Sequence, residues 1–110
     1  MTDEKIAQVA ESFGIPVGAQ RIYENEVSDY NYFIIKKGRL NKNSCNSYTR
    51  TIEIIYVYEG EQKISDSRII KAFEDIRLNF KYAEPDDFRV GSTNKWADMN
   101  TYVFERPEKV

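Results

Sequence analysis

Histidine is missing from this 110-residue chain, and cysteine occurs once, as Cys45. These shortages exclude the usual zinc sites, which need several His or Cys ligands, and any Ser-His-Asp or Cys-His catalytic group. A lone cysteine also excludes an internal disulfide, which fits a reducing cytoplasm. No catalytic motif remains after these exclusions. We therefore expect a protein that is not an enzyme and that has no catalytic, metal-binding or cofactor-binding residues.

Long apolar runs and an excess of positive charge are also missing. The longest apolar run lies around Ile54 to Tyr58, far short of the ~20 residues that span a bilayer, and the N-terminus lacks the apolar stretch of a signal peptide. Basic and acidic residues number 16 and 18, for a net charge of -2. Generic binders of DNA or membrane surfaces carry an excess of Lys and Arg. We expect a soluble, intracellular protein that binds neither a membrane nor a specific nucleic acid.

Apolar and aromatic residues are plentiful enough for one core. Hydrophobic residues make up 41% of the chain, and eight Tyr, six Phe and one Trp are among them. A chain of this length has the commonest size of a single domain. The sequence therefore predicts one domain spanning residues 1–110.

Two helices are predicted from capping residues and apolar periodicity. The first is expected from about Asp3 to Phe13, with Thr2 as its N-cap. The second is expected to begin after the N-cap Ser65 and to run to about Asn79, with an apolar stripe facing the core.

Strands are predicted where β-branched and aromatic residues are dense, over Tyr30 to Lys37, Tyr48 to Tyr58, Phe88 to Ser92 and Trp96 to Glu105. The polar segment from Gly38 to Ser47 is predicted to be a loop that is mobile in the free protein. Glu84 to Asp87 is predicted to be a turn, and Gln20 to Tyr23 is a candidate short edge strand. The order α-β-β-α-β-β predicts an α+β domain, a four-stranded, mainly antiparallel sheet with two helices packed on one face.

Alternation along the strand from Tyr48 to Tyr58 indicates its buried face. One face carries three of its largest apolar side chains, which we expect to pack against the second helix through Phe73 and Ile76. The three strand residues are Ile52, Ile54 and Tyr56.

Charge is distributed unevenly along the chain. The stretch from Tyr30 to Ile52 contains five basic residues and no acidic one, so the rest of the chain carries a net charge of -7, given the overall -2. A basic loop on an acidic body is expected where the loop of one copy docks on the next copy. The alternative is a solvated loop whose charges contribute little. The candidate subunit-interface residues are Lys36, Lys37, Arg39, Leu40, Lys42 and Arg50.

Aromatic residues on the predicted strands leave a second interpretation open. Exposed strand aromatics can stack unpaired bases, and basic residues at their edge would bind the phosphates. The set would comprise Tyr32, Tyr56, Tyr58, Lys36, Lys37 and Arg39. Core packing and a protein interface are favoured over bases, because the net charge offers no excess of positive charge. A single-stranded nucleic-acid-binding module remains the alternative function.

The element order α-β-β-α-β-β, the long polar loop in the first hairpin and the lack of catalytic residues together resemble the tail terminator proteins of tailed phages. These are also called tail-completion or tail-to-head joining proteins, and some relatives are known as minor capsid proteins. The resemblance covers essentially the whole chain at the level of element order. It implies a structural phage or prophage morphogenesis protein whose copies form a ring, commonly a hexamer, at the end of the tail tube. Another head–tail connector component is the neighbouring possibility.

The same resemblance implies the partners and the location. The chain would bind other copies of itself, the tail tube protein and the head connector protein. It would act first in the host cytoplasm, during assembly, and then in the virion at the head–tail interface. No cofactor is expected.

Overall fold

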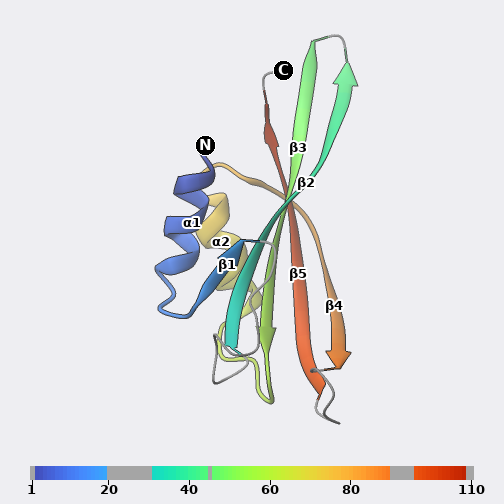
Figure 1. Cartoon of the computed structure of the whole chain (residues 1–110). Coiled ribbons are helices and arrows are strands. Elements are labelled where there is room, and N and C mark those ends of the chain that lie inside the picture. The colour runs from blue at the N-terminus through green and yellow to red at the C-terminus, as the bar shows by residue number, and fades with distance from the viewer. Residues whose placement is uncertain (1, 20–30, 45, 90–95, 109–110) are drawn as a thin grey trace.

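The computed structural model describes residues 2–19, 31–44, 46–89 and 96–108. The elements are α1 (Asp3–Glu11), β1 (Val17–Ala19), β2 (Asn31–Ser44), β3 (Ser47–Tyr58), α2 (Asp66–Glu74), β4 (Asn79–Arg89) and β5 (Trp96–Pro107). The strands form one five-stranded sheet in the order β1-β2-β3-β5-β4. Strand β1 runs parallel to β2, and the other neighbouring strands are antiparallel. Both helices lie on one face of the sheet (Figure 1).

The α+β class and the placement of both helices on one face are therefore confirmed. The predicted four-stranded sheet is wrong in detail, because β1 adds a fifth, parallel strand at the edge. This strand is only three residues long, and its pairing with β2 begins at Val17, which lies opposite Phe33. The backbone N–H of Phe33 also donates to Pro16 O at 2.9 Å. So short a pairing leaves little alternation by which to recognise a strand in the sequence.

Both predicted N-caps are confirmed. The Thr2 side chain accepts a hydrogen bond from the backbone N–H of Lys5 at 3.1 Å, and the Ser65 side chain accepts one from Arg68 at 3.4 Å. Each bond satisfies one of the free N–H groups in the first turn of a helix.

Helix α2 ends at Glu74, and the prediction that it runs to Asn79 is wrong. Arg77 adopts a left-handed backbone with φ of 70°. The N–H groups of Arg77 and Leu78 then donate to Glu74 O and Phe73 O at 2.9 and 3.2 Å. This is the hydrogen-bond pattern of a Schellman motif, in which the left-handed position is usually glycine. With arginine there, the sequence carried no stop signal.

The core lies between the two helices and the central strands, as predicted for Ile52, Ile54 and Tyr56, all of which are buried. Phe73 is fully buried among them, and Ile76 packs against the edge of the same cluster. The Phe73 and Phe104 rings lie 5.7 Å apart, centroid to centroid. Other members of the cluster are Ile6, Ala10, Phe33, Ile64, Ile69, Leu78 and Tyr102.

The predicted loop over residues 38–47 is wrong. Strand β2 continues to Ser44 and β3 begins at Ser47, so the hairpin is paired almost to its tip. Side-chain bonds across the strands help to hold this polar section together: the Asn41 amide donates to Thr51 Oγ1 and the Asn43 amide to Thr49 Oγ1, both at 3.4 Å. The predicted mobility of these residues in the free protein stays a prediction.

The predicted turn over residues 84–87 is also wrong. It lies inside β4, where Pro85 pairs in register with Asn100 of β5. Because β4 is an edge strand, a proline is tolerated there. The predicted final strand is confirmed and extends to Pro107. The candidate edge strand at residues 20–23, the end of the predicted strand 88–92 and the predicted turn at 93–95 lie outside the described residues.

Candidate assembly surface

The outer part of the β2–β3 hairpin, residues 38–51, projects beyond both helices (Figure 1), and we call it the arm. It contributes to an elongated molecule, 49 × 25 × 22 Å. None of its described residues is buried. The arm therefore has no core of its own and is held by strand pairing and by contacts at its base.

A bulge at the base of the arm sets its geometry. Lys37 pairs with Ile52, and Leu40 pairs with Arg50, so Gly38 and Arg39 stand opposite one residue. A Cβ at Gly38 would lie 3.2 Å from Thr51 Cβ, which is tighter than an ordinary contact. Glycine lets the two backbones approach at this bend.

A network of ion pairs ties the base of the arm to both ends of the described chain. Asp3 of α1 contacts Lys37 Nζ at 2.9 Å and Arg106 Nη1 at 2.7 Å through its two carboxylate oxygens. Glu108 contacts Arg50 Nε at 2.6 Å and Arg106 Nη2 at 3.8 Å. Arg50 also donates to Gly38 O at 3.2 Å. The network lies on the helix-bearing side, where it joins α1, β2, β3 and the end of β5.

Sequence reasoning missed three residues of this network, Asp3, Arg106 and Glu108, and Arg106 is the most buried of them. Its side chain is 8% exposed, and a buried guanidinium needs anionic partners to offset its desolvation. The hydrogen bond from Lys37, followed by the bond and charge of Arg106, holds the pKa of Asp3 below its usual range, although partial burial opposes this. The alternation of β5 places Arg106 on the same face as Phe104, which is the one signal that could have found it.

The structure does not bring the six predicted interface residues together into one patch. Lys37 and Arg50 are engaged within the chain. Leu40 pairs with Arg50 and Lys42 with Tyr48, so Leu40 and Lys42 point to the helix-bearing face of the sheet. Lys36 pairs with Glu53 and points to the opposite face. Arg39 lines a hollow on that opposite face. Within the described chain, the exposed cations Lys36, Arg39 and Lys42 have no ion-pair partner.

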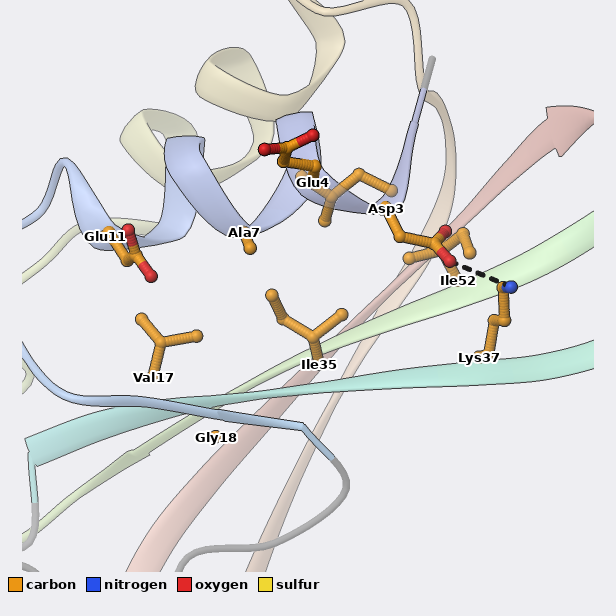
Figure 2. Close-up of a pocket in the computed structure, with 10 residues that line it drawn as sticks. Asp3, Glu4, Ala7, Glu11, Val17, Gly18, Ile35, Lys37 and Ile52 are labelled. Atoms are coloured by element: carbon orange, nitrogen blue, oxygen red, sulfur yellow. Dashed lines mark ion pairs between the residues drawn. The ribbon is translucent and has the colours of Figure 1, made fainter.

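A groove of about 480 Å³ lies between α1 and the sheet. Figure 2 shows Ala7 of α1 facing Val17 and Ile35 across it. Its lining is mostly apolar, and its polar residues are all charged; the full set is Asp3, Glu4, Ile6, Ala7, Glu11, Val17, Gly18, Ile35, Lys37 and Ile52. Sequence reasoning did not find it, because the groove depends on β1.

A second hollow, of about 400 Å³, lies at the base of the arm on the face without helices. It is mainly polar and includes Tyr82, which is 50% exposed. Its lining residues are Gly38, Arg39, Asn41, Thr51, Glu53, Lys81, Tyr82 and Val103. Lys81 Nζ lies 3.8 Å from a Glu105 oxygen, so part of its charge is already compensated.

The three tyrosines proposed for base stacking do not form an exposed platform. Tyr32 and Tyr56 are buried, with 5% and 0% exposure, and they lie on opposite faces of the sheet. The Tyr56 ring stacks on Tyr58 at 5.2 Å, and its hydroxyl donates to Asn31 at 2.7 Å. Burial raises the pKa of both Tyr56 and Tyr58.

A cluster of hydrogen-bonded polar side chains at the start of α2 holds the fold together. The buried Tyr102 hydroxyl donates to Asp66, and burial together with this bond raises the pKa of Tyr102. Gln62 donates to Asp66 at 2.8 Å and accepts from Asn100 at 3.2 Å. These bonds fasten the segment before α2 to the sheet. They leave Tyr102 without access to solvent.

Within residues 2–19, 31–44, 46–89 and 96–108, no group of three or more His, Cys, Asp or Glu side chains is arranged to hold a metal ion. In the same ranges, no helix has the length and apolar character that a membrane span requires. Comparison with protein-family models and with curated proteins finds no match to this chain. The resemblance to tail terminators rested on the order α-β-β-α-β-β and on a polar hairpin loop, whereas the structure adds β1 and pairs most of that loop segment as strand.

Proposed function

We propose that this chain is a non-enzymatic structural subunit of a tailed phage or prophage. Copies of it form a ring at the end of the tail tube and join the tail to the head connector. The observation that carries the proposal is the arm, an exposed paired hairpin fixed at its base by ion pairs. Strand β5 pairs with Thr49 to Thr51 at the base of the arm, and outside that section the arm is a two-stranded hairpin, which in isolation is marginally stable in water. A chain that maintains one outside its core has a surface suited to contacts with another subunit.

The shape suits a ring. The arm and the body are different surfaces of one molecule, so an arm-to-body contact that two copies do not exchange reciprocally is head-to-tail. Head-to-tail contacts generate rings when the rotation between neighbours closes. The charge distribution favours this contact, because the basic residues of the stretch 30–52 accompany a body of opposite net charge.

Deletion of the gene from its source phage or prophage tests the proposal. We expect induced lysates to contain separate heads and tails in electron micrographs, and we expect the purified chain to restore joining when it is added. Purified tails should show a ring of added density at one end. Normal numbers of joined particles in the deletion strain would contradict the proposed function.

A further inference from the structure

We infer that the groove between α1 and the sheet receives the arm of a second copy of this chain, with Leu40 as the apolar anchor. The inference rests on the proposed function, because it names the partner and the surface through which copies assemble. It concerns the groove lined by α1, β1, β2 and β3 (Figure 2).

The chemistry of the groove favours an apolar side chain with a cation beside it. Val17, Ile35 and Ile52 supply apolar lining from the sheet. Glu4 and Glu11 are exposed at its edge and have no ion-pair partner among the described residues.

The arm offers the matching chemistry. Leu40 is 37% exposed and is one of two large hydrophobic residues exposed in the described chain, the other being Tyr82. Lys42 shares a face with Leu40, whereas Arg39 points to the opposite face of the arm. Lys42 is exposed and has no ion-pair partner within the described chain.

The spacing of the charges allows one contact beside the anchor. Lys42 lies two residues from Leu40 on the same face of the strand, which is about 7 Å. Glu4 and Glu11 lie seven residues apart on one helix, which is about 10 Å along its axis. Lys42 can therefore lie near one of the two carboxylates while Leu40 enters the groove.

The arm that fills the groove must come from another copy. Lys37, at the edge of the groove, is bound to Asp3 of the same chain at 2.9 Å, and the chain's own arm runs away from α1 beyond this point (Figure 1). Leu40 of the same chain is held in register with Arg50. Its strand would have to separate from β3 to turn back.

The test fills the groove without touching the arm. Ala7 is only partly buried, so Ala7→Trp should fold while its indole occupies the groove. Gln8→Trp places the same side chain on an exposed neighbouring position of α1 outside the groove and is the matched control. In sedimentation equilibrium we expect Ala7→Trp to raise the dissociation constant for self-association at least about 10-fold. Gln8→Trp should leave it unchanged.

The partner surface is tested by disulfide trapping. Two chains are made in a Cys45→Ser background, one with Ala7→Cys and the other with Leu40→Cys. Mixed under mild oxidation, they should form a disulfide-linked pair, whereas Gln8→Cys mixed with Leu40→Cys should not. Trapping detects docking that is too weak to persist in sedimentation.

Charge reversal identifies the groove edge as the acceptor. Glu4→Lys with Glu11→Lys should abolish association, and combining it with Lys42→Glu should restore association. If Glu84→Lys with Asp86→Lys on the edge strand β4 abolishes association while the groove reversal has no effect, the inference is overturned.

The failures of the inference and of the proposed function are distinguishable. If wild type associates and Ala7→Trp associates equally well, the groove inference is wrong and the proposed function stands. If the two cysteine chains give no specific cross-link, the inference is likewise overturned. Normal joining in the deletion strain would contradict the proposed function independently of either result.

Discussion

The two halves of the β2–β3 hairpin are joined by one continuous strand pairing, but they differ in how deeply their side chains are buried. In the inner half, residues 31–37 pair with residues 52–58, and apolar side chains are buried on both faces. Tyr56 on the helix face and Val57 on the opposite face are 0% and 1% exposed. In the arm, the same two strands continue with no buried residue among those described.

This difference shows that a strand pairing can continue into a region that contributes little to the free energy of unfolding. The inner half draws its stability from apolar burial, at roughly 25 cal/mol per Å² removed from water. The arm has backbone hydrogen bonds, two long Asn–Thr side-chain bonds and the ion pairs at its base. Such contacts contribute little net free energy each when exposed. The arm is therefore the half that can adapt to a partner at small cost to the fold.

The largest expected effect comes from the inner half. Phe73→Ala should lower the free energy of unfolding by about 3–5 kcal/mol, because it opens a cavity beside Phe104 in the shared core. Leu40→Ala on the arm is the matched truncation and should change it by less than about 0.5 kcal/mol. Urea melts of the two variants measure both. A loss under about 1 kcal/mol for Phe73→Ala would contradict the core assignment.

The next effect concerns local opening. Hydrogen-bonded amides of the arm should exchange at least about 100-fold faster than those of the inner half, after correction for intrinsic rates, a difference of about 2.8 kcal/mol. The reason is that the arm can open without exposing the core. Hydrogen exchange at low protein concentration measures this and also tests the predicted mobility. Equal protection of the two halves would show that they open as one unit.

The inner half was predictable from sequence, whereas the arm was not. Ile52, Ile54 and Tyr56 alternate with their neighbours, and alternation reports burial on one face directly. The polar stretch 38–47 has no such pattern, so composition indicated a loop. Its strand structure follows from the register set by the buried half, which is a property of two segments together.

Other errors have similar non-local or conformational causes. The end of α2 depends on Arg77 in a left-handed conformation that residue type does not announce. Pro85 indicated a turn, but its position on an edge strand makes it compatible with pairing.

The positive charge of the candidate surface was predictable from the sequence, but the ion pairs that neutralise part of it were not. The basic residues near the first hairpin were apparent from composition. That Lys37 and Arg50 are neutralised required knowledge of Asp3 and Glu108, which lie near opposite ends of the chain. Leu40 was the one apolar residue in the predicted set, and its exposure makes it the anchor of the proposed contact.

A smaller effect is expected at the base of the arm, where the two halves meet. Arg106→Met should lower the free energy of unfolding by about 1–2 kcal/mol, between the values for exposed and buried ion pairs. It leaves Asp3 and Glu108 each without one cation. Lys81→Met removes a cation whose pair with Glu105 is longer, at 3.8 Å, and more exposed, and should cost less than about 0.5 kcal/mol. Equal losses for the two variants would mean that the base network holds the arm no better than an ordinary surface pair.

The smallest effect is a pH dependence of the same network. Because the folded pKa of Asp3 lies below its usual value, the unfolded chain binds more protons as the pH falls through this range. The stabilising contribution of Asp3 is therefore complete above its ordinary pKa of about 3.9 and is lost as the pH falls through the lower, folded value. Its side chain is 60% exposed, so the contribution should stay below about 1 kcal/mol. Urea melts at pH 6 and at pH 2.5 of wild type, Asp3→Asn, Lys37→Met and the double variant should show a coupling between the two residues at the higher pH only. A coupling of the same size at both values would show that the carboxylate charge of Asp3 does not fasten the arm to α1.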